Sequence, residues 1–335
     1  MKVGVLTVFD AVNYGSYLQA YCLQSVLKSK GITDVRMIKD SSMLYEKWRL
    51  TSLITYKPQK MKFKSRLSAG YRKAWKQFRK ASPRDRFDLV IVGSDEMWEV
   101  NNITMEPRPT FFGIGLNTKH LVSYAVSSNT AKPKDLQKYP FIAEGVGKFD
   151  KVSVRDASTY ETYAPLLKEP PVYCIDPTLL VDLRELSKQR LVQGDYILCY
   201  TYSFKPETVA AVKALAAKYN KKIVVAGQSF DWADEVIPAS PFEFLSLILN
   251  ADFVVTDTFH GTVLSIALNK QFVTSAYKEK VYRVVEQFDL LDRNIHGVSD
   301  ITDYYQTKID YTPINDKISK LRKQSLEYID ACLSL

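Results

Sequence analysis

Cysteine, histidine and long apolar runs are all scarce in this chain. Its 335 residues include four cysteines, which form no CxxC pair and lie near no histidine at metal-ligand spacing. We therefore expect no metal, no cofactor and no disulfide framework, as in a protein of a reducing compartment. No stretch approaches ~18 consecutive apolar residues, the length that spans a bilayer. The opening residues MKVGVLTVFD predict a core strand rather than a signal peptide, so we expect a cytoplasmic protein.

Basic charge is concentrated in one part of the chain. The whole sequence carries 46 Lys and Arg against 37 Asp and Glu. Between Lys47 and Arg86, however, 14 basic residues face one acid, Asp85. The basic character of the protein is therefore local, and we expect the partner of this segment to be anionic.

Short β-branched runs alternate with segments of helical periodicity, which predicts mainly parallel sheets with crossover helices. A length of 335 residues suits two domains of about 150 residues each. We predict an α/β fold of two doubly wound, Rossmann-like domains that face each other across a cleft. The expected ranges are an N-terminal domain at 1–180 with a basic helical insertion at about 45–86, a C-terminal domain at 181–312 and a terminal helix at 313–335.

The expected strands are short apolar runs without alternation, as in a parallel sheet that is covered on both faces. In the first domain we expect strands at 3–8, 35–38, 89–92, 121–126 and 152–154, and helices at 17–29 and 157–167. In the second we expect strands at 196–202, 223–226, 253–256 and 272–276, and helices at 206–219, 241–250 and 262–269. Ligands of such folds bind beyond the carboxyl ends of the strands, so the loops that follow the strands are the candidates.

The run from Asp257 to Thr262 joins an expected central strand to a helix and carries one of the three histidines, His260. A helix N-terminus favours phosphate or carboxylate because its N–H groups and dipole point toward the ligand. Thr258 and Thr262 offer hydroxyls there, and Gly261 permits close backbone approach. His260 is the candidate proton carrier. The alternative is that Asp257 or Thr258 only caps the helix.

The loop after the first strand holds Asn13, Tyr14 and Gly15 and leads into a helix. A first strand, loop and helix with a glycine often hold a ligand, so these residues are candidates for an acceptor site. A single glycine does not make a dinucleotide fingerprint. Asn13 or Ser16 can also serve simply as the N-cap of the helix, and both interpretations stay open.

The loop after the strand at 89–92 contains Ser94, Asp95 and Trp98. A carboxylate such as that of Asp95 can orient a sugar hydroxyl, and an indole such as that of Trp98 can stack on the face of a sugar. The three residues are therefore candidates for the acceptor site or the cleft. The alternative is a turn that carries a half-buried tryptophan.

Arg155 stands at the end of the strand expected at 152–154. A guanidinium in that place can clamp a phosphate or carboxylate with two hydrogen bonds, which makes Arg155 a candidate donor-binding residue. The alternative is a structural salt bridge to Asp156 or Glu161.

Six segments of the chain follow one another in a characteristic order and spacing. They read NYGSYLQAYCLQSVL at 13–27, FDLVIVGSDEMW at 87–98, SYAVSS at 123–128, VSVRDAS at 152–158, IDPTLLVD at 175–182 and ADFVVTDTFHGTVLSIALNKQFV at 251–273. Each segment is weak alone. Together, over roughly residues 3 to 290, they resemble the polysaccharide pyruvyl transferase family.

The resemblance implies a fold similar to the GT-B glycosyltransferase type, with phosphoenolpyruvate as donor and a pair of sugar hydroxyls as acceptor. The implied product is a pyruvate ketal on a glycan, with release of phosphate. By resemblance, His260 matches the family histidine that contacts the donor and supplies acid–base function. Arg155 matches an arginine of the donor phosphate or carboxylate site.

The chain departs from the family pattern at one position. Many members carry Arg two residues before the histidine, whereas this chain has Thr258, as the TDSFHG-type members do. One positive charge for donor binding is thereby absent. A charge-assisted hydrogen bond of this kind contributes roughly 1.5–3 kcal/mol to binding. Lys278, Lys280 and Arg283 are the candidates to replace it.

The basic segment from Lys60 to Ala81 predicts an amphipathic helix. A Lys/Arg-rich face with Trp and Phe opposite is typical of a helix on anionic lipid, which fits a lipid-linked acceptor and a peripheral position at the inner face of the membrane. The alternative is that the stripe packs on the domain and the cations are solvated. No recognition motif accompanies the charge, so we expect no nucleic acid partner. The apolar stripe consists of Phe63, Leu67, Tyr71, Trp75 and Phe78.

Three functions remain open from the sequence. The first is a transferase of surface-polysaccharide synthesis that adds a pyruvyl ketal from phosphoenolpyruvate to a glycan or its lipid-linked precursor. The second is a GT-B-type glycosyltransferase that uses a nucleotide-sugar donor. The third is a binding protein that keeps the fold without the catalysis.

Overall fold

The computed structural model describes residues 1–40, 58–102, 106–187, 189–275, 277, 279–295, 297–298 and 300–335, apart from the side chain at 59. Lys278 and the first part of the expected basic insertion, 45–57, lie outside the described residues. The chain divides into two compact units. Unit 1 lies within Met1–Ile54, Trp75–Val181 and Ser319–Leu335, and unit 2 within Thr55–Ala74 and Asp182–Ile318.

Unit 1 is built on a parallel sheet of five strands in the order β3-β2-β1-β4-β5. The central strands are buried: Val3 of β1 lies between Val35 of β2 and Leu89 of β4. This burial explains the uninterrupted apolar runs of the sequence. The strands are β1 (Lys2–Leu6), β2 (Asp34–Ile38), β3 (Lys80–Ala81), β4 (Phe87–Val92) and β5 (Thr118–Ser123).

Helices cover this sheet, and a small parallel pair of strands extends the unit. The crossover from β1 to β2 is α1 (Tyr14–Ser29), which buries most of its length. Further elements are α4 (Pro133–Leu136), α5 (Phe141–Val146), α6 (Ala157–Tyr163) and the paired strands β6 (Ser153–Val154) and β7 (Val172–Tyr173).

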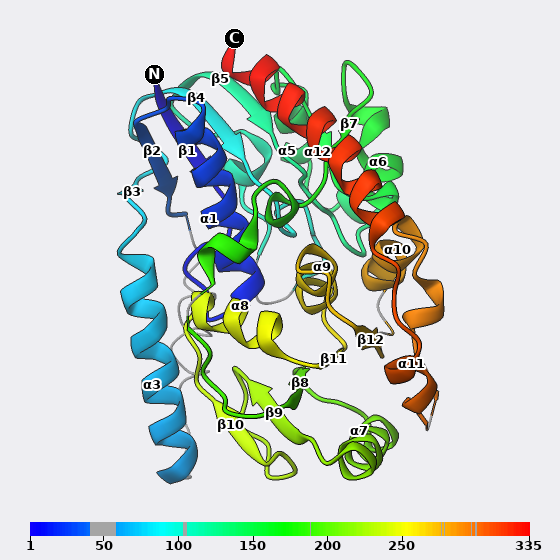
Figure 1. Ribbon diagram of the computed structural model, residues 1–335. Helices are drawn as coiled ribbons and strands as arrows, with labels where there is room; N and C mark the ends of the chain where they lie inside the picture. Colours follow the sequence, from blue (N-terminus) through cyan, green and yellow to red (C-terminus); the bar gives the residue numbers. More distant parts are fainter. Residues whose placement is uncertain are drawn as a thin grey trace. The chain divides into compact units, whose positions relative to one another are not determined.

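The last helix, α12 (Thr312–Leu333), has its second half in unit 1. Its side chains bond the backbone there: the Tyr328 hydroxyl donates to the Ser123 carbonyl at 2.8 Å, and the buried Ser325 hydroxyl accepts from the Ile175 N–H at 3.1 Å. Figure 1 shows α12 in red beside the strands of unit 1. The expected terminal helix at 313–335 is thus present, and the contacts group most of it with the N-terminal unit.

Unit 2 repeats the architecture with the strand order β10-β9-β8-β11-β12, again all parallel. The strands are β8 (Tyr196–Tyr200), β9 (Lys222–Ala226), β10 (Glu235–Ile237), β11 (Phe253–Thr256) and β12 (Phe272–Thr274). The helices include α7 (Pro206–Tyr219), α8 (Pro241–Asn250), α9 (Phe259–Ala267), α10 (Glu279–Gln287) and α11 (Thr302–Gln306) (Figure 1). The prediction of two doubly wound α/β domains is confirmed, and the cleft between them stays a prediction.

The basic segment forms α3 (Pro58–Trp75), and its apolar stripe is buried except at Trp75, which is half-buried. Phe63, Leu67 and Tyr71 are at most 8% exposed, and a Cβ on Gly70 of the same helix would lie 3.3 Å from Ser240. The packing alternative is therefore correct for the stripe, which cannot insert into lipid while it is buried.

The predicted end of this helix at Ala81 is wrong. The helix stops at Trp75, and Lys80–Ala81 forms the edge strand β3 beside β2. The backbone bonds from Met37 N to the Arg79 carbonyl and from Lys39 N to the Ala81 carbonyl hold this strand, so sheet pairing overrides the helical periodicity.

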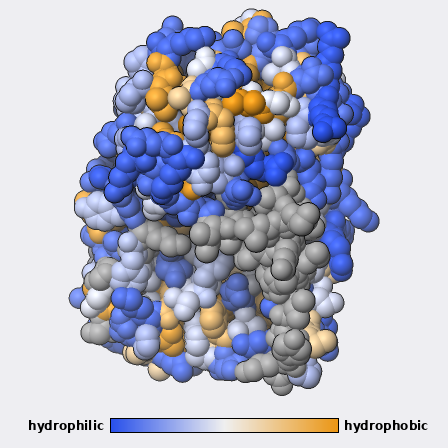
Figure 2. Space-filling view, turned by 180° about the vertical axis from the view of Figure 1, so that it is seen from behind, coloured by the Kyte–Doolittle hydropathy of each residue, from blue (hydrophilic) through white to orange (hydrophobic). Residues whose placement is uncertain are grey.

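No helix among the described residues is long and apolar enough to cross a membrane. Where Figure 2 colours the surface, hydrophilic residues predominate and hydrophobic ones form separate patches. Scattered apolar residues of this kind are normal on a protein surface and mark no binding site by themselves.

Candidate functional site

The turn between β11 and α9 is held together by its own hydroxyls. Thr258 is the N-cap of α9, and its hydroxyl accepts the Gly261 N–H at 2.9 Å. The Thr262 hydroxyl donates to the Thr258 carbonyl at 3.0 Å. Thr258 is 8% exposed and Thr262 is fully buried. Both hydroxyls therefore stabilise the turn, and the expectation that they face the donor is corrected.

Gly261 is required by this packing. A Cβ at that position would lie 2.1 Å from the Thr256 Oγ1 and 2.6 Å from the Thr258 Oγ1, distances at which atoms overlap. The two hydroxyls themselves lie 3.0 Å apart. The close approach expected at Gly261 is thus made by threonine side chains of the same turn, and its N–H is used by the cap rather than by a ligand.

His260 lies in the first turn of α9, which begins at Phe259, three residues before the predicted helix start at Thr262. Its imidazole is half-buried and meets the ring of Phe259 edge to face at 5.0 Å. Beside it, the Asp257 carboxylate accepts a hydrogen bond from the Thr201 hydroxyl at 2.7 Å. The turn thus carries both an imidazole and a carboxylate at the carboxyl end of β11. The sequence indicated Asp257 only as a cap, although it stands three residues from the histidine.

In unit 1, Arg155 forms a buried ion pair with Asp176. The Nη1 atom lies 3.0 Å from the Asp176 carboxylate, and the two side chains are 5% and 3% exposed. The same Nη1 donates to the Ser94 hydroxyl at 3.3 Å. Arg155 thus forms a salt bridge, with Asp176 instead of Asp156 or Glu161, and its role in donor binding stays a prediction. Sequence reasoning missed Asp176, although it stands in the segment IDPTLLVD.

Asp95 joins the loops that follow β1 and β4. Its carboxylate accepts the Ser16 hydroxyl at 2.8 Å, and the Asn13 side chain caps α1 by accepting the Ser16 N–H at 3.1 Å. The backbone of Asp95 has φ of 93°, which for a non-glycine residue costs of order 1–3 kcal/mol. Such strain is concentrated at functional sites, and Asp95 keeps a half-exposed side chain. The structure thus brings together two loops that the sequence indicated separately, and their role in acceptor binding stays a prediction.

Four candidates for the acceptor site are buried, including Ser94, which is 0% exposed. Trp98 is 0% exposed, donates its Nε1–H to the Phe111 carbonyl at 2.9 Å and packs on Tyr163 at 4.7 Å. Tyr14 is 2% exposed and Gly15 is buried in the first turn of α1. The expectation that Trp98 stacks on a sugar is therefore wrong, because a large aromatic side chain here fills the core of unit 1.

A sequence model of polysaccharide pyruvyl transferases matches residues 13–279, which is most of the chain. The chain belongs to the polysaccharide pyruvyl transferase family. No curated protein matches it. The family makes it a transferase enzyme, and the resemblance that the six segments indicated is confirmed.

Solved structures similar to this pyruvyl transferase family member share its fold at low sequence identity. The S. aureus MnaA–UDP co-structure has a TM-score of 0.55 at 12% identity, covering 100% of this chain and 98% of that one. A putative UDP-N-acetylglucosamine 2-epimerase from Listeria monocytogenes has a TM-score of 0.54 at 10% identity, covering 99% of this chain and 95% of that one. The Methanocaldococcus jannaschii UDP-GlcNAc 2-epimerase in complex with UDP-GlcNAc and UDP has a TM-score of 0.52 at 13% identity, covering 100% of this chain and 99% of that one. The likeness supports the predicted GT-B-like fold.

The pyruvyl transferase turn has no arginine at position 258, and Arg283, a candidate to replace it, already forms ion pairs. Its guanidinium is bound by two carboxylates of α10, at 2.8 Å from Glu286 and 3.5 Å from Glu279. These pairs neutralise the charge on the helix itself. Lys280 is half-buried on the same helix.

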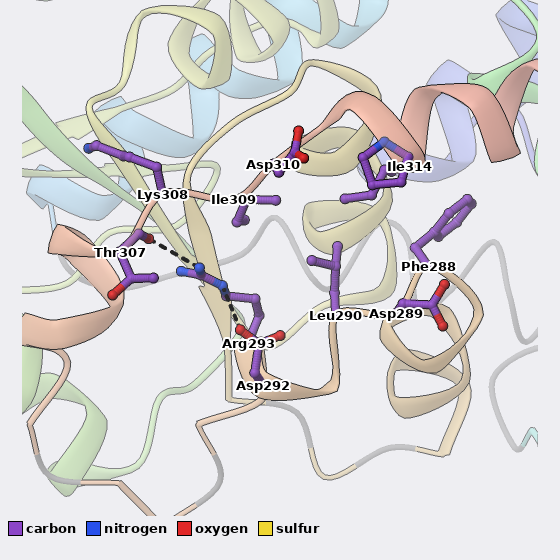
Figure 3. A pocket seen from close by; sticks show the side chains of 11 residues that line it. Phe288, Asp289, Leu290, Asp292, Arg293, Thr307, Lys308, Ile309, Asp310 and Ile314 are labelled. Atoms are coloured by element: carbon purple, nitrogen blue, oxygen red, sulfur yellow. Dashed lines mark hydrogen bonds and ion pairs between the residues drawn. The ribbon is translucent and has the colours of Figure 1, made fainter.

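A separate cavity of about 300 Å³ lies in unit 2 and contains none of the predicted site residues. Figure 3 shows Arg293 at its wall, directed toward Thr307 and Asp292. The guanidinium also donates to the Tyr304 carbonyl at 3.0 Å, and its side chain is 4% exposed. Arg293 therefore ties the segment after α10 to α11, which is a structural role.

Proposed function

We propose that this pyruvyl transferase family member transfers the pyruvyl group of phosphoenolpyruvate to two hydroxyls of one sugar. The acceptor belongs to a surface polysaccharide or its lipid-linked precursor, and phosphate is released. The observation that carries the proposal is the position of His260. Its half-buried imidazole lies at the carboxyl end of a central parallel strand, where α/β folds bind their ligands, in a chain of this family.

The proposed chemistry needs one proton donor and acceptor. The first sugar hydroxyl adds to C2 of phosphoenolpyruvate while His260 delivers a proton to C3, which becomes the methyl group. The hydroxyl proton restores the imidazole. Phosphate then leaves C2, the second hydroxyl takes its place, and its proton leaves with the phosphate. An imidazole suits this work because it gains and loses a proton near neutral pH.

Arg155 is the proposed anion ligand of unit 1. Its buried pair with Asp176 holds the guanidinium in one orientation, which favours recognition of a planar carboxylate or a phosphate. We assign Asp176 the task of positioning Arg155. Asp95, with its strained backbone, is the proposed ligand of an acceptor hydroxyl.

The outward face of α3 supplies the proposed contact with an anionic membrane. Lys62, Arg66, Arg72 and Lys73 are exposed on the side opposite the buried stripe, and residues 58–75 include no acid. Since the apolar side chains are buried, the contact is made by charge alone, at about 1 kcal/mol for each cation near the surface.

Release of phosphate from phosphoenolpyruvate with candidate glycan acceptors tests the reaction. We expect His260→Gln to lower the rate by about 100-fold or more, the usual contribution of a general acid–base group. His120→Gln is the matched control, because His120 belongs to β5 and pairs with Asp150. A variant at His260 with the wild-type rate excludes the assigned role. Release of nucleotide from a UDP-, GDP- or CMP-sugar, without use of phosphoenolpyruvate, points to the glycosyltransferase alternative.

A further inference from the structure

Two loops of unit 2 flank the turn that carries His260. In the sheet, β11 lies between β8 and β12, and Thr256 at the end of β11 is in register with Tyr200 on one side and Thr274 on the other. The residues that follow Tyr200 and Thr274 therefore leave the sheet on either side of the His260 turn. Two contacts already join these segments to β11 and its turn: Thr201 bonds Asp257, and the Ser275 N–H bonds the Thr256 carbonyl.

A cation and an aromatic ring connect these two flanking loops. Lys205, after β8, places its Nζ 3.8 Å from the centre of the Tyr277 ring, after β12. Because the loops lie on opposite sides of β11, this pair meets beyond the carboxyl end of that strand. Lys205 is exposed, and Tyr277 is 46% exposed. The cation–π contact thus holds an ammonium in open solvent at the edge of the sheet where ligands bind.

The surroundings of Lys205 favour an anion. Lys205 is the N-cap of α7, so the positive end of a helix of 14 residues begins at the same place. Its side chain makes no capping bond. A lysine ammonium recognises phosphate as a point charge, and a cation–π contact at an exposed site is weak enough to leave its N–H donors for a ligand.

We propose that Lys205, held in place by Tyr277, binds the phosphate of the donor substrate. This inference rests on the proposed function, in which a donor with a phosphate and a carboxylate must approach His260. Thr258 turns its hydroxyl into the protein, and Arg283 is paired with two glutamates, so we assign the phosphate-binding charge to Lys205 among the described residues. Tyr277 is a positioning residue, because its ring fixes where the Lys205 ammonium lies beyond the end of β11.

Isothermal titration of the full chain with phosphoenolpyruvate tests the assignment. We expect Lys205→Ala to weaken binding roughly 10- to 100-fold, the range for a lost charged hydrogen bond. Lys213→Ala is the matched control, because Lys213 is an exposed lysine of the same helix. Tyr277→Phe should retain the wild-type affinity and Tyr277→Leu should lose part of it. Wild-type affinity in Lys205→Ala overturns the inference while leaving the proposed reaction intact.

A second titration with UDP-GlcNAc separates this inference from the proposed function. If the wild type binds UDP-GlcNAc and not phosphoenolpyruvate, the proposed donor is wrong. Weaker binding of UDP-GlcNAc by Lys205→Ala would then still support the phosphate-binding role of Lys205. A wild type that binds neither ligand overturns both proposals.

Discussion

Neighbouring residues of the turn between β11 and α9 have different tasks. Thr258, Gly261 and Thr262 are buried and bond one another, whereas His260 between them is half-buried. The first three hold the backbone of the turn, and the position of the imidazole follows from that backbone. A substitution at a buried member should therefore affect stability and activity together.

The substitution Gly261→Ala is the sharpest test of this packing. Its Cβ meets the Thr256 Oγ1 at 2.1 Å, so we expect a loss of about 1–3 kcal/mol in the free energy of unfolding, measured by urea denaturation, and a lower rate of phosphate release. Gly147→Ala is the control, because Gly147 has a φ of −65° and its Cβ would find the nearest atom at 3.5 Å. Equal stability of the two variants would contradict the packing argument.

The ion pair between Arg155 and Asp176 makes a second prediction at single residues. Arg155→Met leaves a buried carboxylate without its cation, and such a loss costs about 3–5 kcal/mol. We expect the double variant Arg155→Met/Asp176→Asn to recover part of that stability in the same denaturation assay. If the double variant regains stability and remains inactive, Arg155 has a role beyond folding. If the single variant unfolds like the wild type, the pair does not stabilise unit 1.

At the scale of elements, one carboxylate connects three strands of the first unit at their amino ends. Asp88 of β4 accepts the backbone N–H of Lys2 in β1 at 2.8 Å and pairs with Lys119 of β5 at 2.9 Å. The Lys119 ammonium, together with the Lys2 N–H, lowers the pKa of the Asp88 carboxyl from 3.8 to about 2. One side chain thereby joins three neighbouring strands.

This shift predicts a pH-dependent contribution to stability. Because the pKa of the folded state lies below that of the unfolded state, Asp88 stabilises the protein above about pH 4 and the effect is lost as the pH falls toward 2. We expect Asp88→Asn to lower the melting temperature at pH 7, with a difference from wild type that shrinks toward pH 2. Scanning calorimetry over this range measures it. A difference that stays constant with pH would show that the charge is not the cause.

The whole molecule combines two units with a local concentration of positive charge. Its net charge of +9 arises from the segment between Lys47 and Arg86. The structure shows which side chains of α3, within that segment, are exposed to solvent. The apolar stripe of α3 is buried and its cations are exposed. Any attraction to a membrane must therefore be electrostatic and sensitive to salt.

Vesicle co-sedimentation tests this surface. We expect binding to vesicles with anionic phospholipid at low ionic strength, no binding to neutral vesicles, and release as salt is added. The double variant Lys62→Glu/Arg66→Glu should lose most of the binding. The control Lys213→Glu/Lys218→Glu makes the same change in net charge on exposed positions of α7. Equal loss in both variants would mean that net charge, and not the face of α3, decides the binding.

The sequence by itself determined the class of fold and indicated the loops that carry the candidate site residues. Apolar runs, helical periods and caps are local signals, so they predicted α7, α8 and β11 with their observed bounds and placed His260 at a turn between strand and helix. They missed the short edge strand β10 and extended the basic helix too far, because edge strands depend on pairing with a neighbour.

Only the tertiary structure decided which side chains of those loops face one another. The pairing of Arg155 with Asp176, the burial of Trp98 and the meeting of Lys205 with Tyr277 all join residues that are separated along the chain. Such contacts follow from the order of strands in each sheet, and local sequence carries no record of that order. Gly261 is the contrasting case, because the hydroxyls that leave no room for a Cβ there belong to Thr256 and Thr258 of the same turn.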